Sequence, residues 1–389
     1  MVAEIALSIV LLISGGLLIK SFSTLASTDL GFDRNGLVTA RINLPAASYP
    51  GEGQRVVFYQ SLLDRLSRIP GVTAAGSAQG APMTGWNVQS SMVIEGKPPR
   101  APTDQLVVHS QAVSPTYFQA LGVPLLRGRG LTALDRDTIN PVAVINDILA
   151  RDEFGDADPV GRRIRWGQSD IPDPNPRWVT IVGVVKSIRH YRLPQEMGPA
   201  LYLPYAAFPA PQQDLVVRAT AADPLSVVPA IRAAVRELDP SVPIFRVGTF
   251  DQTLARVLWQ QRLQGQVAGV FAVLALLLAS IGIYGVISYS VSQRTRELGI
   301  RAAIGASNRD LTRLVVREGG MLALWGIGIG AVGALAFTRL LAALLHGVEP
   351  TDGPTFVAAP VVLAVVTLIA SWVPARRAAR VDPLVAIRE

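Results

Sequence analysis

Residues that could do chemistry are few in this sequence and lie far apart. The three histidines, His109, His190 and His346, have no carboxylate or second histidine at the spacing of metal ligands. The segment "GVVKS" at residues 183–187 lacks the spacing of a phosphate-binding loop, and no GxSxG nucleophile motif occurs. Cysteine is absent, which excludes thiolate metal sites, cysteine nucleophiles and disulfides. We therefore expect no catalytic residue, metal or cofactor in this chain.

Hydrophobic residues make up half of the 389 and are concentrated in long runs. Three runs of at least 20 residues carry no charged side chain, which is enough to cross about 30 Å of hydrocarbon. They predict transmembrane helices at about residues 266–290, 319–338 and 354–374. No ionisable residue falls in the middle of these helices, which argues against an aqueous substrate channel.

A fourth apolar run, Ile5–Ile19, has 15 uncharged residues between Glu4 and Lys20. It can span if Lys20 extends outward and Glu4 lies in the opposite headgroup layer. Its length also suits a cleaved signal peptide, with small residues nearby for cleavage. A signal peptide begins with basic residues, however, and none precedes this run. We therefore expect an uncleaved transmembrane helix at residues 1–22.

The charge of the chain is unevenly distributed. Residues 23–255 hold 22 Lys and Arg against 21 Asp and Glu, a net of +1 out of the total of +7. Residues 292–317 hold six Arg against two acidic residues, and the tail 374–389 holds four Arg against two. Short basic segments beside membrane helices stay in the cytoplasm, so both termini are expected on the cytoplasmic side of the membrane and block 23–255 outside. The alkaline isoelectric point then reflects membrane orientation, and we expect no nucleic-acid partner.

The external block, residues 23–255, is predicted to be a mixed α/β domain. Strand, amphipathic helix and strand follow one another in residues 37–78, and the same order recurs in residues 214–247, where Asp223 is placed to cap the helix. Two such units predict one split ferredoxin-like layer with a subdomain inserted at about residues 85–205. A helix at Thr249–Gln264 is expected to lead straight into the second transmembrane helix. The predicted fold class is thus four transmembrane α-helices plus a large α/β periplasmic domain between the first two.

The basic segment between the second and third transmembrane helices is Ser292–Asp310, "SQRTRELGIRAAIGASNRD". Residues 295–304 are expected to be helical, with Glu297 and Arg301 paired at i, i+4. Such a segment could anchor on anionic lipid or dock against a protein. Docking is favoured because the apolar strip consists of small residues and contains no Trp or Phe.

The end of this segment predicts a sharp turn. Gly305 suits a helix stop in the left-handed conformation. Ser307 then starts a new helix, with Asp310 three residues later as a shortened capping box. A short helix, a turn and a capped second helix make a rigid elbow that can transmit force.

The third transmembrane helix contains a GxxxG pair, Gly326 and Gly330, followed by Gly333. Small residues at this spacing favour close packing of helices in membranes. The alternative is a loose, flexible, lipid-facing helix.

Several of these segments carry a family resemblance. The cytoplasmic loop of FtsX-like ABC transporter permeases, the MacB-like group, is similar to "QRTRELGIRAAIGASNRDLTRLVVREG", and their C-terminal ending resembles "WVPARRAARVDPLVAIRE". The MacB-type periplasmic core domain is similar to "AVSPTYFQALGVPLLRGRGLTALD", "PVAVINDILARDEF" and "WVTIVGVVKSIRH". The likeness covers nearly the whole chain and is closest to one half of the large duplicated permeases of acidobacteria.

The resemblance implies a type VII architecture in a bacterial inner membrane, with both termini cytoplasmic. Residues 23–255 would form the MacB-like periplasmic core domain, and residues 256–389 the FtsX-like permease domain with a coupling helix that meets an ATPase. The resemblance implies coupling positions at Arg294, Glu297, Leu298, Arg301, Ala302 and Gly305. To these we add Ile304, at the end of the expected short helix, and Ser307, at the start of the next helix.

Two features depart from the family pattern. MacB carries an ATPase domain in its own chain, whereas this sequence has no Walker motif, so ATP-Mg is expected on a separate cytoplasmic ABC ATPase. The basic amphipathic segment before the first helix is also missing, which suggests a truncated form or one half of a duplicated permease. Further expected partners are a second permease copy or homologous half, a periplasmic adaptor and membrane lipid.

The hypothesis from the sequence is mechanotransmission. ATP hydrolysis by the partner would change the conformation of the periplasmic domain, for export or extraction of a lipoprotein, peptide or small amphiphile. The alternative is a non-transporting FtsX-like signalling or scaffold protein that activates a periplasmic partner.

Overall fold

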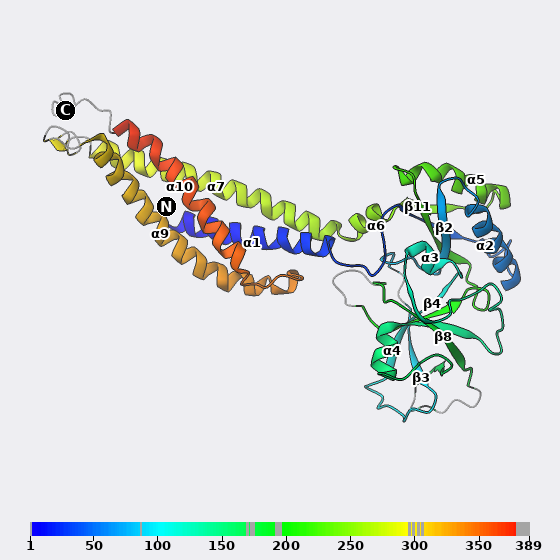
Figure 1. Cartoon of the computed structure of the whole chain (residues 1–389). Coiled ribbons are helices and arrows are strands. Elements are labelled where there is room, and N and C mark those ends of the chain that lie inside the picture. Colours follow the sequence, from blue (N-terminus) through cyan, green and yellow to red (C-terminus); the bar gives the residue numbers. More distant parts are fainter. Residues whose placement is uncertain are drawn as a thin grey trace. The chain divides into compact units, whose positions relative to one another are not determined.

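The computed structural model consists of two compact units, one helical and one α/β (Figure 1). The helical unit comprises Met1–Thr28 and Leu258–Glu389, and the α/β unit comprises Asp29–Val257. The residues that the structure describes are 2–85, 88–168, 171, 176–190, 197–294, 297, 300, 301, 304 and 307–378.

Among these residues, four helices are long and apolar enough to cross a membrane. They are α1 (Val2–Ala26), α7 (Trp259–Gln293), α9 (Asn308–Leu340) and α10 (Gly353–Ala378). With 35 and 33 residues, α7 and α9 reach about 50 Å, well beyond the hydrocarbon thickness. Both helices therefore extend past the apolar runs, because their polar ends continue the backbone hydrogen bonding.

The first helix, α1, lies at the centre of the helical unit and contacts α7, α9 and α10 (Figure 1). Ile5, Ile9, Ile13 and Leu17 follow one another at four-residue spacing and are fully buried. Their cluster includes Ala279 and Ile283 of α7, Ala334 of α9 and Leu363 of α10. The first apolar run is thus an integral helix of the bundle.

Glycines of α9 face α1. A Cβ atom added to Gly326 would lie 2.4 Å from Ile5 Cγ2, and one added to Gly330 would lie 2.7 Å from the carbonyl oxygen of Ala6. Both positions therefore let the two helix backbones approach more closely than any side chain would permit. The Cβ position of Gly328, in contrast, has no atom within 4 Å.

Polar contacts join the end of α1 to the segment before α10. Lys20 Nζ donates to Asp352 Oδ1 at 2.6 Å, and the same carboxylate accepts from the backbone N–H and hydroxyl of Thr355 at 3.1 and 2.7 Å. The Lys20 hydrogen bond is the main cause that lowers the pKa of Asp352. The Ser21 hydroxyl accepts from the His346 N–H at 2.8 Å and donates to the His346 carbonyl at 3.1 Å. These contacts fix the loop to α1.

The first and last segments of the α/β unit together form the predicted split ferredoxin-like fold. Its elements are β1 (Leu37–Asn43), α2 (Glu52–Leu66), β2 (Val72–Ala78), β10 (Gln212–Ala219), the 3₁₀ helix η1 (Pro224–Val227), α5 (Val228–Leu238) and β11 (Ile244–Thr249). The strands lie in the order β11-β1-β10-β2 and are all antiparallel to their neighbours. Val38, Ala40 and Ile42 alternate along β1 into a core shared with α2 and α5. Asp223 accepts from the Leu225 N–H at 3.0 Å and caps η1.

The segment inserted between β2 and β10 extends the same sheet. Its elements are β3 (Gln89–Ile94), β4 (Leu106–Val113), α3 (Tyr117–Leu121), β5 (Leu125–Gly128), β6 (Val142–Asn146), α4 (Asp147–Phe154), β7 (Arg163–Trp166), β8 (Val179–Val185) and β9 (Ala200–Pro204). The two parts join where Ala78 of β2 pairs with Val113 of β4. The parallel strands β6 and β8 lie at the heart of a second core with α4.

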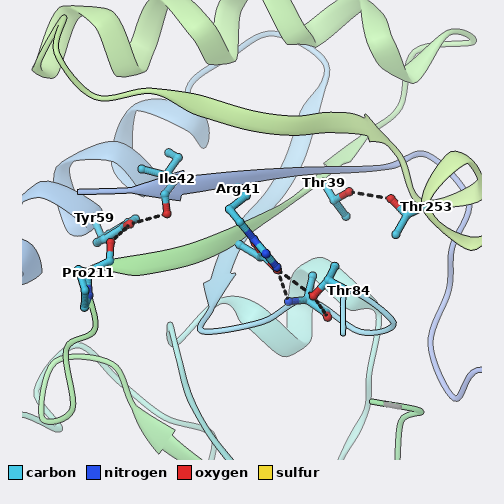
Figure 2. A network of polar contacts seen from close by, with 9 residues as sticks. Thr39, Arg41, Ile42, Tyr59, Thr84, Pro211 and Thr253 are labelled. Atoms are coloured by element: carbon cyan, nitrogen blue, oxygen red, sulfur yellow. Dashed lines mark hydrogen bonds and ion pairs between the residues drawn. The ribbon is translucent and has the colours of Figure 1, made fainter. Parts of the chain in front are cut away.

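The first and last segments of the α/β unit are held together. Arg34 pairs with Asp251 at 3.6 Å, and the hydroxyls of Thr39 and Thr253 lie 3.4 Å apart (Figure 2). Asp251 and Thr253 belong to α6 (Phe250–Val257), which packs one apolar face on β1. The prediction of one continuous helix over Thr249–Gln264 is wrong, because the backbone is non-helical at the buried Leu258. The break separates a helix with one apolar face from α7, which is apolar on all sides.

A buried ion pair links β1 to β10. The Arg41 guanidinium donates two hydrogen bonds to Asp214, at 2.6 and 2.8 Å, which raises the pKa of Arg41 (Figure 2). Asp214 also accepts from the Ala81 N–H at 2.9 Å and the Thr84 hydroxyl at 3.0 Å. The carboxylate thereby holds the turn that contains Met83, a buried residue with a positive φ of 64°.

Two of the histidines that are far apart in the sequence lie together. The rings of His109 (β4) and His190 stack with centroids 4.1 Å apart, and His190 Nε2 lies 2.7 Å from the Tyr202 hydroxyl. Within the described residues no group of three His, Asp or Glu could hold a metal ion. Burial lowers the pKa of His109 to about 4, and burial together with His109 lowers that of His190 well below its usual value.

We expect Gly330→Ala to loosen the packing of α1 on α9, because the added methyl would overlap the Ala6 carbonyl. Overpacking of this kind costs about 1–3 kcal/mol, so the thermal midpoint of the detergent-solubilised chain should fall by about 3 °C or more. Gly328→Ala is the matched control and should leave the midpoint unchanged. Equal midpoints for the two variants would contradict this account.

The stacked histidines predict that the α/β unit loses stability in mild acid. Their pKa values are lower in the folded chain than the unfolded value of 6.5, so the folded state binds fewer protons. Stability is complete above pH 6.5 and falls as the pH drops toward about 4; His109 alone should account for about 2 kcal/mol at pH 5. Urea unfolding at pH 7.5 and pH 5 measures the loss. His109→Gln should reduce it and His346→Gln should not; identical pH dependence in both variants would refute the assignment.

Candidate functional site

The candidate site is the elbow between α7 and α9. The helix α7 ends at Gln293, and the Arg294 N–H closes its last turn on the carbonyls of Ser290 and Val291, each at 3.2 Å. Of the residues that follow, Glu297, Ile300 and Arg301 are helical and Ile304 lies in a turn.

The short segment carries one ion pair. Arg301 donates to Glu297 Oε1 at 2.7 Å, four residues along the chain, and both side chains are about half exposed. Such a pair supports a helical turn by only a few tenths of a kcal/mol. Both charged groups remain accessible to solvent.

Two isoleucines occupy the same segment. Ile304 is 82% exposed and Ile300 is 44% exposed, and the Ile304 N–H donates to the Ile300 carbonyl at 3.0 Å. Residues four apart lie on one helix face, so the two side chains form a small apolar patch beside the ion pair. Ile300 was not among the coupling residues expected from the sequence, although its spacing from Ile304 is a signal that could have identified it.

The next helix begins with a capping box. The Ser307 hydroxyl accepts from the Asp310 N–H at 3.3 Å, and Asp310 accepts from the N–H and the hydroxyl of Ser307 at 3.2 and 2.6 Å. The Ser307 hydroxyl is the main cause that lowers the pKa of Asp310. The box pairs the Ser307 N–H and gives the Asp310 N–H, which also donates to the Ser307 carbonyl at 2.9 Å, a second acceptor. These contacts fix where α9 begins.

Three of the expected coupling residues, Leu298, Ala302 and Gly305, lie outside the described residues. The helix stop at Gly305 therefore stays a prediction. Of the expected packing residues, Gly326 and Gly330 face α1, and a Cβ on Gly333 would contact Val10 Cγ2 at 3.4 Å.

The described part of the elbow has features suited to recognition. Its side chains provide one ion pair, two exposed isoleucines and a rigid helix start, in which Asp310 holds the Ser307 hydroxyl as part of the capping box. These features suit a partner protein that presses on the segment.

Among solved structures, the periplasmic region of MacB from Actinobacillus actinomycetemcomitans aligns with 16% identity and a TM-score of 0.38. The alignment covers 59% of this chain and 94% of that one.

Curated relatives match at the level of sequence. The macrolide export ATP-binding/permease protein MacB of Nitrosomonas europaea is 26% identical over 91% of this chain and 52% of the relative. The pyoverdine export ATP-binding/permease protein PvdT of Pseudomonas aeruginosa is 29% identical over 70% of this chain and 41% of the relative. This chain spans about half the length of the curated relatives it matches.

Two family descriptions match in succession along the chain. The FtsX-like permease C-terminal family matches residues 269–383, which contain most of α7, the elbow, α9 and α10. The MacB-like periplasmic core domain family matches residues 1–238, more than half of the sequence. The chain therefore belongs to the MacB-like permeases, with a MacB-like periplasmic core domain followed by an FtsX-like permease C-terminal region.

Proposed function

We propose that this chain is the membrane permease subunit of a MacB-type ABC transporter. The observation that carries the proposal is the elbow between α7 and α9, a short helix with an exposed isoleucine pair followed by a capped helix start. It lies within the region that matches the FtsX-like permeases. A rigid joint of this kind can receive a push from a partner and pass it to both adjoining helices.

The proposed orientation places the elbow and both termini in the cytoplasm and the α/β unit in the periplasm. The six arginines of residues 292–317 support this orientation, because short basic segments remain inside. The contact of Lys20 with Asp352 also supports it, since it puts the end of α1 and the segment before α10 on one side of the membrane. That side is opposite to the elbow in the proposed topology.

The proposed energy source is ATP-Mg bound by a separate cytoplasmic ABC ATPase. The relatives' names combine ATP-binding with permease, and this chain spans about half of their length. Its own residues contain no Walker motif, so hydrolysis would occur outside them.

In the proposed mechanism, closure of the ATPase pushes the segment from Glu297 to Ile304. The capped start of α9 passes the displacement to α1, because Gly326 and Gly330 hold these two helices in close contact. The helices α1 and α7 flank the α/β unit in the sequence, so their movement changes the conformation of that unit. The proposed work is export or extraction of a lipoprotein, peptide or small amphiphile, with a second permease copy or homologous half and a periplasmic adaptor as further partners.

We predict that the full chain, tagged and purified in mild detergent from the bacterium that encodes it, carries an ABC ATPase with it. Ile300→Glu combined with Ile304→Glu should reduce recovery of this ATPase at least tenfold, because two carboxylates would be buried in the contact. Mass spectrometry identifies the ATPase, and phosphate release measures its turnover.

The matched control is Leu134→Glu with Ile139→Glu, which makes the same change at two exposed positions of the α/β unit. It should leave recovery unchanged. Absence of an ABC ATPase from the wild-type preparation, or equal recovery with both double variants, would refute the proposal. An ATPase that binds but moves no periplasmic substrate would favour the signalling or scaffold alternative.

A further inference from the structure

The helices α9 and α10 enclose an apolar groove that the helical unit leaves unfilled. Its volume is about 370 Å³. One wall is formed by α9 with Gly320, Ala323 and Ile327, and the other by α10 with Ala364 and Leu368. Three of the nine lining residues are glycine or alanine, whose small side chains leave room between the two helices. Its volume lies in the range that small-molecule ligands fill.

A charged residue stands at one end of the groove. Arg317 is exposed and lines both this groove and a second hollow of about 530 Å³, which Leu314, Met321 and Leu322 complete. Arg317 and Met321 line both hollows, so the two hollows adjoin at these residues. A ligand with one anionic group and two apolar chains matches this arrangement, with the anionic group at Arg317 and one chain in each hollow.

The depth of Arg317 suits a phosphate group. The apolar part of α9, Thr312–Leu340, has 29 residues and measures about 43 Å, which exceeds the hydrocarbon thickness by about 13 Å. About 6 Å at each end then lies in the headgroup layer. Arg317 lies five residues, or about 8 Å, inside this end, and so at the hydrocarbon boundary.

Residues of α10 mark the same boundary. The Arg376 guanidinium carbon lies 5.2 Å from the centroid of the exposed Trp372 ring, and tryptophan is typical of membrane interfaces. A Cβ on Gly319 would lie 2.9 Å from Ser371 Oγ, which sets Arg317 and Trp372 at the same level of the two helices. A second arginine is therefore available at the same depth.

The length of the groove distinguishes between occupants. From Arg317 to Ile327 the α9 axis rises about 15 Å, half of the hydrocarbon thickness. A transmembrane helix of a second copy would run along the whole thickness. One acyl chain occupies one leaflet, which is the depth that this groove offers.

We propose that the groove between α9 and α10 binds an anionic glycerophospholipid. One acyl chain lies between the two helices, the second lies in the hollow beside Leu314 and Leu322, and Arg317 contacts the phosphate. Arg376 adds positive charge at the same level. Charge complementarity favours an anionic headgroup over a zwitterionic one, by about fivefold for each arginine near the surface.

The test is native mass spectrometry of the full chain, delipidated in detergent and incubated with equal amounts of dioleoylphosphatidylglycerol and dioleoylphosphatidylcholine. The wild-type chain should retain the anionic lipid at least fivefold in excess. Arg317→Gln should lower the ratio about fivefold, whereas Arg339→Gln, at the opposite end of α9, should preserve it. Equal binding of both lipids to the wild type, or a ratio that Arg317→Gln leaves unchanged, would overturn the proposal.

A second variant tests the acyl-chain part of the site. Ala364→Phe fills the groove and should reduce retention of both lipids severalfold, whereas Val365→Phe, at an exposed neighbouring position, should not. If the groove seats a second copy instead, Ala364→Phe would change the oligomeric state measured by light scattering and leave lipid retention intact. That outcome would also overturn the proposal.

Discussion

The close contact of α1 with α9 is the constraint on which the helical unit depends. Lipid is as apolar as the side chains, so helices in a membrane gain their association from shape rather than from exclusion of water. The buried stripe of α1 from Ile5 to Leu17 supplies the ridge, and Gly326 and Gly330 of α9 supply the surface that receives it. Because α1 also contacts α7 and α10, it organises the whole bundle. Between α9 and α10 an unfilled groove remains.

The α/β unit depends on a different kind of interaction. Its two β-α-β halves are far apart in the sequence, and β1 and β10 join them through seven paired positions. Among these, Arg41 and Asp214 form a largely buried ion pair. Burying two charges costs desolvation free energy, and removing either side chain would leave the other charge without its partner. Asp214 also holds the turn at Ala81 and Thr84, directly after β2. The Asp214 carboxylate thus links the pairing of β1 with β10 to the start of the inserted segment.

Local patterns made much of this architecture predictable. Uncharged runs indicated the four transmembrane helices, periodicity indicated both β-α-β halves, and the spacing of Ser307 and Asp310 indicated the capping box. Features set by long-range packing were not predictable. The break at Leu258 depends on how α6 meets β1, and the stacking of His109 on His190 depends on strand pairings within the insert. The isoleucine pair of the elbow was only half identified, because exposure cannot be read from a short basic segment.

The pairing of β1 with β11 has a consequence for how such a protein diversifies. The chain enters and leaves the α/β unit on adjacent strands, with Val38 opposite Thr249, and neighbouring strands lie only about 5 Å apart. The insert repeats this arrangement, since β2 and β10, which precede and follow it, are also neighbours. The unit is thus a nested insertion, closed at two levels by its own sheet. Recombination can enlarge, shrink or exchange either the insert or the whole α/β unit at little cost in loop-closure entropy. The distance between the two chain ends that enter and leave the exchanged segment would stay the same.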